Sequence, residues 1–76
     1  MVMETALRAK FTQNPELAEL LLNTGDNLII EANPSDKYWS CGLSLFNADI
    51  WNPTSWIGKN TLGYLLMKIR AEISKT

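Results

Sequence analysis

The sequence predicts a mainly α-helical protein: a small domain of about three helices, with one short extended segment and a long aromatic-rich loop. Apolar residues recur at helical spacing near both ends of the chain, whereas the middle has neither helical nor strand periodicity. The length of 76 residues allows one domain at most, over residues 1–76, with a core of marginal size.

Two helices are expected in the first 25 residues. Residues 2–13 carry apolar side chains among charged ones and contain no helix breaker, which favours a first helix. Asn14 is a favourable N-cap and Pro15 fits the first position of a second helix, which Gly25 can end in the left-handed conformation. The apolar face of this second helix consists of Leu17, Leu20 and Leu21.

The middle of the chain predicts loops. Residues 28–31 form a short β-branched run, which fits either a strand or an extended buried connector. Residues 37–59 contain all three tryptophans and two glycines. Loops of this length in a small domain are commonly functional, and the aromatic content argues against disorder. We therefore expect an ordered binding loop.

A final helix is expected to begin near Asn60 and Thr61. Its apolar residues share one face and predict a core stripe: Leu62, Leu65, Leu66, Ile69 and Ile73. Gly63 lies in the first turn, where glycine costs about 1 kcal/mol relative to alanine. A ligand or a packed neighbour is therefore expected to approach the backbone there.

Composition excludes several classes of function. A chain without histidine has no Ser-His-Asp or Cys-His relay and no histidine-containing zinc site, and a single cysteine excludes an internal disulfide. Seven basic against eight acidic residues give no electrostatic footprint for nucleic acid or an anionic membrane. There is neither an apolar run of about 20 residues nor a hydrophobic signal core. We expect a cytoplasmic protein that binds no nucleic acid and no membrane.

Asp36 is the carboxylate in the most suggestive setting, because it comes just before Tyr38 and Trp39. Aromatic walls partly desolvate a carboxyl group, which makes proton exchange near neutral pH easier. The alternative is that Asp36 only caps the turn that begins at Asn33 and Pro34.

The run Gly58-Lys59-Asn60-Thr61-Leu62-Gly63 is a second candidate. Glycines allow a phosphate to approach the backbone, and helix N-terminal amides together with a lysine attract anions. The run is not a Walker A motif. The alternative is an ordinary helix start capped by Asn60 or Thr61.

The tryptophans are a third candidate. Trp39, Trp51 and Trp56 suit stacking on a flat heterocycle, but they equally suit a small core that needs large apolar side chains. Cys41 has no activating base nearby in the sequence, which favours an idle thiol.

Several motifs occur in a fixed order along the chain. They are Ala6-Leu7-Arg8-Ala9-Lys10-Phe11, Gln13-Asn14-Pro15, Leu21-Leu22-Asn23-Thr24-Gly25-Asp26, Asp36-Lys37-Tyr38-Trp39-Ser40-Cys41-Gly42-Leu43, Trp56-Ile57-Gly58-Lys59-Asn60-Thr61-Leu62-Gly63 and Leu66-Met67 with Arg70. In combination they resemble the C-terminal half of the NADAR family (NAD- and ADP-ribose-related proteins), which includes the riboflavin biosynthesis intermediates N-glycosidase. The family usually has glycine where this chain has Ser40.

The resemblance implies half of a helical NADAR fold and hydrolysis of N-glycosidic bonds in phosphorylated ribosyl compounds. The substrates would be riboflavin intermediates or ADP-ribose derivatives, with no metal or organic cofactor. Asp36 would be the acid/base and Trp39 a stacking wall. The substrate pocket would be shaped by Gly42, Gly58, Asn60 and Gly63.

The resemblance also implies that the N-terminal half of the domain is missing. A companion chain that carries this half, or a homodimer, would then complete the site. The alternative is a non-catalytic, truncated remnant, of phage origin for example, that acts as a small protein-interaction or inhibitor module.

Overall fold

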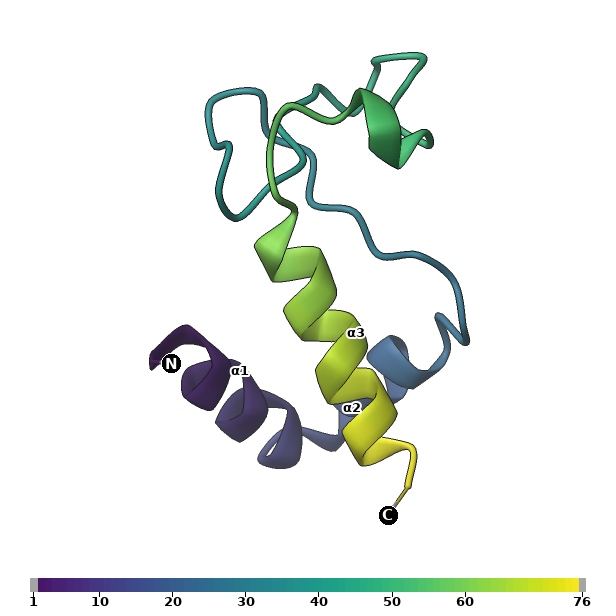
Figure 1. Ribbon diagram of the computed structural model, residues 1–76. Coiled ribbons are helices and arrows are strands. Elements are labelled where there is room, and N and C mark those ends of the chain that lie inside the picture. The colour runs from purple at the N-terminus through teal and green to yellow at the C-terminus, as the bar shows by residue number, and fades with distance from the viewer. Residues whose placement is uncertain (1, 76) are drawn as a thin grey trace. The chain divides into compact units, whose positions relative to one another are not determined.

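The computed structural model describes residues 2–75 and confirms a mainly α-helical chain (Figure 1). It contains α1 (Val2–Thr12), α2 (Pro15–Leu22), a 3-10 turn η1 (Pro53–Ser55) and α3 (Thr61–Ile73), with no strand among these residues. The expected extended segment 28–31 is a connector without strand pairing. Both end residues of the predicted domain lie outside the described part.

All three predicted helices are present, with starts at the predicted positions. α2 begins at Pro15, although the side chain of Asn14 makes no capping hydrogen bond. The chain leaves α2 through Gly25, whose φ of +63° is the left-handed conformation expected there. Turn residues and helix starts are readable from sequence because one or two side chains determine them locally.

The chain divides into two compact units. The first contains the residues up to Leu28 together with those from Leu65 onward, and the second contains residues 29–64. α3 therefore contributes its first turn to the second unit and its remainder to the first.

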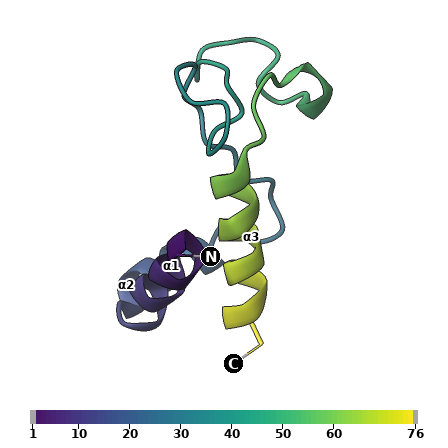
Figure 2. The ribbon, with the colours of Figure 1, turned by 60° about the vertical axis from the view of Figure 1, so that its left-hand side comes forward.

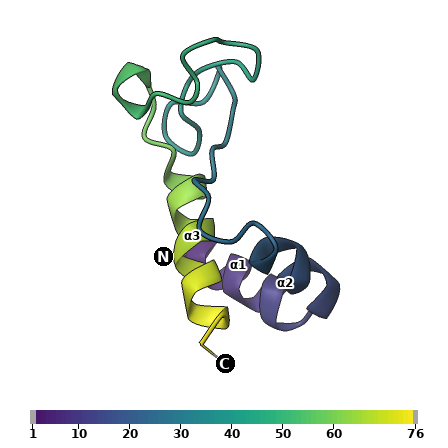
Figure 3. The same cartoon turned by 90° about the vertical axis from the view of Figure 1, so that its right-hand side faces the viewer.

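In the first unit, α1 and α2 pack side by side (Figures 2 and 3). Leu21, Leu65 and Ile69 are buried and form its apolar core. The predicted apolar face of α2 is only partly covered, because Leu20 is 64% exposed. Part of the apolar face of α2 is therefore open to solvent.

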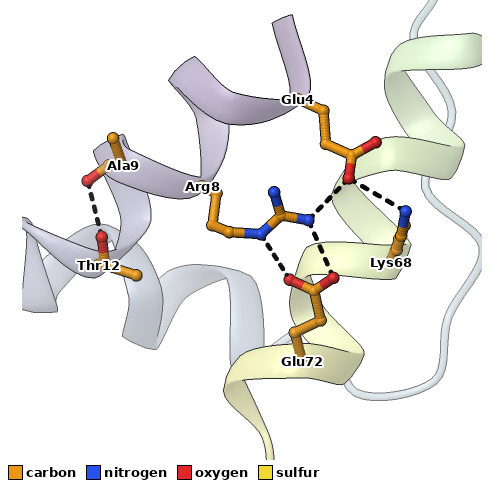
Figure 4. A network of polar contacts seen from close by, with 6 residues as sticks. All are labelled: Glu4, Arg8, Ala9, Thr12, Lys68 and Glu72. Carbon is orange, nitrogen blue, oxygen red and sulfur yellow. Dashed lines mark hydrogen bonds and ion pairs between the residues drawn. The ribbon is translucent and has the colours of Figure 1, made fainter. Parts of the chain in front are cut away.

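Four charged side chains join α1 to α3 in the first unit (Figure 4). Arg8 donates to Glu72 at 2.8 and 3.0 Å and to Glu4 at 2.7 Å. Lys68 also donates to Glu4, at 3.0 Å. Hydrogen bonds from Arg8 and Lys68 lower the pKa of Glu4 to about 2, and the Arg8 bonds lower the pKa of Glu72.

The second unit has a small core in which polar side chains are as buried as apolar ones. Cys41 and Ile50 are its buried apolar residues, and Ser40 and Asn60 are fully inaccessible to solvent. Long loops require such polar groups inside, because their backbone donors and acceptors must find partners without a sheet.

Candidate functional site

All the predicted site residues lie in the second unit, where two stretches of backbone run together. Amides of the later stretch donate to carbonyls of the earlier one at 2.8–3.1 Å. The pairs are Gly58 to Cys41, Lys59 to Lys37, Asn60 to Ser40, Thr61 to Tyr38 and Leu62 to Trp39. The structure thus brings the Asp36–Gly42 stretch against the start of α3.

Asn60 lies at the centre of this arrangement and is completely buried. Its Oδ1 accepts from the Glu31 amide at 2.8 Å, and its Nδ2 donates to the Ile29 carbonyl at 3.0 Å. Its φ of 52° is the left-handed conformation that asparagine tolerates better than most residues. Asn60 therefore holds the connector 29–31 in place and does not face solvent.

Gly63 is packed against the same connector. A Cβ at this position would collide with the Ile29 carbonyl oxygen and would lie 2.5 Å from the Asn60 Nδ2 atom. The close approach expected from the sequence is therefore present, and a packed neighbour makes it.

Gly42 and Gly58 are pressed against each other in a similar way. A Cβ on Gly58 would lie 2.8 Å from the Gly42 nitrogen, and one on Gly42 would lie 2.6 Å from the Ile57 side chain. Gly42 also has a φ of +78°. These glycines allow the two backbone stretches to meet.

The amides at the start of α3 are already bonded. The N–H groups of Lys59, Asn60, Thr61 and Leu62 all donate to carbonyls of the second unit. A phosphate could take them only by displacing those carbonyls, so any anion bound here must be recognised chiefly by a side chain.

Lys59 is the side chain placed for that role. Its Nζ lies 5.5 Å from the centroid of the Tyr38 ring, and among residues 2–75 it forms no ion pair with a carboxylate. Tyr38 is itself 44% exposed. The sequence indicated Lys59 because this lysine lies within the glycine-rich run. It did not indicate that Tyr38, twenty-one positions earlier, is its neighbour.

Asp36 caps its turn with one oxygen. Its Oδ1 accepts from the amides of Tyr38 and Trp39, both at 2.9 Å, so the side chain caps the turn that follows it, whereas the turn that begins at Asn33 is closed by the Asp36 amide, which donates to the Asn33 carbonyl at 3.2 Å. Within the described residues its second oxygen accepts no hydrogen bond, and the side chain is only half-buried. The turn therefore fixes the orientation of a carboxylate that keeps one oxygen for other partners.

The three tryptophans have different surroundings. Trp39 is half-buried and meets Tyr38 edge-to-face, with ring centroids 4.7 Å apart. Trp56 is half-buried, donates from Nε1 to the Ile50 carbonyl at 2.7 Å and lies near Tyr64. Trp51 is 75% exposed. Trp39 is thus the one tryptophan beside Asp36, where a stacking wall was predicted.

Ser40 is a supporting residue of this site that the residue pattern alone does not reveal. It is fully buried, and its hydroxyl donates to the Asn33 carbonyl at 2.6 Å. The same oxygen accepts from the amides of Asn33 and Gly42, at 3.0 and 2.8 Å. Ser40 therefore closes the loop that carries Asp36. Its neighbour Cys41 is buried as well, with its thiol directed at the Leu43 carbonyl.

Two features are absent from the described part of the chain: a cluster of metal-ligating side chains and a helix that could cross a membrane. No group of three or more potential metal-ligating side chains occurs among residues 2–75. None of the helices described there combines the length and apolar character needed to cross a bilayer.

The comparisons with known proteins point to one family. The model of the NADAR domain matches residues 1–74. An N-glycosidase of Acanthamoeba polyphaga mimivirus is 52% identical over 65 residues, which are 86% of this chain and 38% of that protein. The N-glycosidase YbiA of Escherichia coli is 41% identical over 73 residues, 96% of this chain and 39% of that protein. An N-glycosidase of Nostoc punctiforme is 36% identical over 72 residues, 95% of this chain and 39% of that protein.

The chain therefore spans about two fifths of the length of the curated relatives it matches. No solved structure matches it significantly.

Proposed function

The chain belongs to the NADAR domain family, and from this we propose that it forms part of an N-glycosidase acting on phosphorylated ribosyl compounds. The substrates we propose are riboflavin intermediates or ADP-ribose derivatives. The observation that carries the proposal is the oriented Asp36 carboxylate, with one oxygen unbonded among the described residues, next to the half-buried Trp39.

This pair suits the charge changes of the reaction. As the bond between the sugar C1 and the base nitrogen breaks, the sugar carbon gains positive character and the base leaves with the bonding electrons. The free oxygen of Asp36 would stabilise that charge or accept a proton from the attacking water. The indole of Trp39 would hold the departing base by stacking. Water supplies the hydroxyl on C1, and a proton ends on the base.

A phosphate on the substrate would be recognised by Lys59. The neighbouring amides are engaged with carbonyls, whereas the Lys59 ammonium lies over an exposed ring and has no carboxylate partner among the described residues. Tyr38 and Lys59 would thus present an aromatic face and a cation on the same side of the loop.

Further residues of a NADAR protein would complete this site. The matched relatives extend well beyond the region that they share with this chain. We propose that a further NADAR segment, or a second copy of the chain, supplies the remaining walls of the pocket.

The experiment is a release assay for ribose phosphate from a phosphorylated N-riboside, with the chain supplied together with the unmatched segment of the mimivirus relative. We expect Asp36→Asn to abolish turnover, because an asparagine Oδ1 still caps the turn but the carboxylate is lost. Asp49→Asn, an exposed position in the same unit, is the matched control. Full turnover by Asp36→Asn would refute the assignment.

A second variant tests the phosphate contact. Lys59→Gln should raise KM for the phosphorylated substrate about tenfold or more and leave KM for the unphosphorylated riboside unchanged. Lys37→Gln controls for the general effect of removing one positive charge. Equal losses on both substrates would assign Lys59 to structure instead.

The second candidate function is a non-catalytic interaction module. Large apolar side chains that project into solvent from the second unit favour it, Phe46 at 92% exposure above all. Stable binding of a protein partner with no turnover, even in the complemented mixture, would select this function.

A further inference from the structure

Several large hydrophobic side chains of the second unit are exposed to solvent, and the three most exposed of them lie on one loop. Leu45, Phe46 and Trp51 are 68%, 92% and 75% exposed. We call these three residues the apolar knob. Burial of such side chains is a main source of interface stability, and this loop exposes three of them within seven consecutive positions.

The loop that carries the knob is held by its own polar side chains. The Ser44 hydroxyl accepts from the Phe46 amide at 3.2 Å, and Oδ1 of Asn47 accepts from the Asp49 amide at 2.8 Å. Asn52 caps η1 in the same way. The backbone of the loop is therefore folded without contacts from the knob side chains. Burying them against a partner would then cost little conformational entropy of the loop.

The composition of the loop indicates the kind of partner. Residues 43–56 contain one charged side chain, Asp49, beside two tryptophans, a phenylalanine and two leucines. Surfaces that pair transiently carry many charges at their rim, whereas permanent or intradomain surfaces resemble a core cut in half. With Leu45, Phe46 and Trp51 exposed and one charged residue, the loop resembles a permanent or intradomain surface.

We propose that the apolar knob docks into the portion of a NADAR domain that lies outside the matched region, supplied by the same or by another polypeptide. This inference rests on the proposed function. The relatives carry about three fifths of their length beyond the shared region, which leaves ample chain to form a complementary pocket. The knob thereby fixes that portion on the unit that holds Asp36.

A second copy of the chain is a poorer occupant. A shallow, wide-open apolar hollow lies along α1, lined by Val2, Thr5, Ala6 and Ala9. A knob from one copy inserted into this hollow on the next would be a head-to-tail contact, and such contacts grow into open chains unless they close into a ring. The prediction for a second copy is therefore concentration-dependent polymerisation.

The test is co-purification of the tagged chain with the unmatched segment of the mimivirus N-glycosidase, co-expressed as a separate polypeptide, followed by light scattering. We expect a one-to-one complex with the native chain. The double variant Phe46→Ser, Trp51→Ser should weaken it at least a hundredfold. Because both side chains are exposed, the variant should keep its helical circular dichroism. Leu20→Ser, an exposed apolar position in the first unit, should bind like the native chain.

Equal binding by the knob variant and the native chain would overturn the proposal. So would polymers of the native chain alone that disappear both in the knob variant and in Ala6→Glu, because the second copy would then be the occupant. A complex that needs the knob but shows no turnover would support the docking surface and refute the proposed hydrolysis. Turnover by the native chain alone, without a complex, would support the proposed hydrolysis and refute the docking surface.

Discussion

Asn60 combines two features that are seldom found in one residue. Its side chain replaces the hydrogen bonds that a neighbouring strand would give to Ile29 and Glu31, and its own backbone occupies the left-handed region. Both features belong to one residue, yet the backbone groups that its side chain bonds lie about thirty positions earlier in the sequence. The sequence therefore indicates a special residue at the helix start without indicating which segment it holds.

Asn60→Ala is expected to destabilise the second unit by about 3 kcal/mol. Two backbone groups lose their partners, and alanine adopts a positive φ only with strain. All three tryptophans lie in the second unit, so urea unfolding followed by tryptophan fluorescence reports on it directly. Asn23→Ala, an exposed position, is the control. An unchanged urea midpoint for Asn60→Ala would show that water replaces the lost bonds.

Gly63→Ala provides a test in which two effects have opposite signs. Alanine should gain about 1 kcal/mol of helix propensity over glycine. The Ile29 carbonyl and the Asn60 side chain leave no room for the added methyl group, so we expect a net loss of about 1–3 kcal/mol. Gly25→Asn should be nearly neutral, because that position has open space and asparagine tolerates its φ. A stabilised Gly63→Ala protein would contradict the packing described here.

The residue types of the candidate site were predictable from the sequence, but the contacts that each residue makes were only partly predictable. Asp36 and the glycines stood out because turns and close approaches require them. That Asn60 is buried, that Ser40 closes a loop, and that Lys59 lies over Tyr38 all depend on contacts between residues distant in sequence. No local propensity encodes such contacts.

Among the elements, α1 is joined to α3 by charged side chains. Glu4 and Glu72 both accept hydrogen bonds from Arg8, and both have a lowered pKa. A carboxyl group with a pKa lower in the folded than in the unfolded protein stabilises the fold above its unfolded pKa of 4.5. That stabilisation is lost as the pH falls toward the folded value, about 2 for Glu4.

We therefore expect the first unit to lose stability between about pH 4.5 and pH 2. Urea unfolding monitored by far-ultraviolet circular dichroism, which follows the helices, measures this loss at several pH values. In Arg8→Gln the decrease over this interval should be smaller, because both carboxylates lose their main partner. Lys10→Gln, also on α1, should behave like the native chain. A pH dependence identical in Arg8→Gln and the native protein would exclude the network as its cause.

The starts of the helices were predictable because Pro15 and the residues around Asn60 act locally. The charge network was not, because Arg8 and Glu72 lie 64 positions apart in the sequence. Lys68 and Glu72 lie four positions apart on α3, but in the structure Lys68 donates to Glu4 on α1 instead. Spacing along one helix favours a weak pair, and a tertiary partner replaces it.

In the whole molecule, a single helix serves two cores. The first turn of α3 is bonded into the second unit through Tyr38, Trp39 and Ser40, and its later turns bury Leu65 and Ile69 in the first unit. Residues 29–64 carry every candidate site residue, whereas the first unit carries the charge network. Hydrophobic periodicity along the sequence does not indicate this division, because it reports the face of a helix and not the unit that covers it.

The two units should therefore respond separately to substitutions. Arg8→Gln is expected to lower the midpoint seen by circular dichroism, to which α1 and α2 contribute, and to leave the fluorescence midpoint in place. Asn60→Ala should do the opposite, apart from fraying of the first turn of α3. Each variant is the control for the other, since the two substitutions fall in different units. If both probes shift together in both variants, α3 couples the cores into one cooperative structure, and damage to the charge network would then reach the site at Asp36 through the helix.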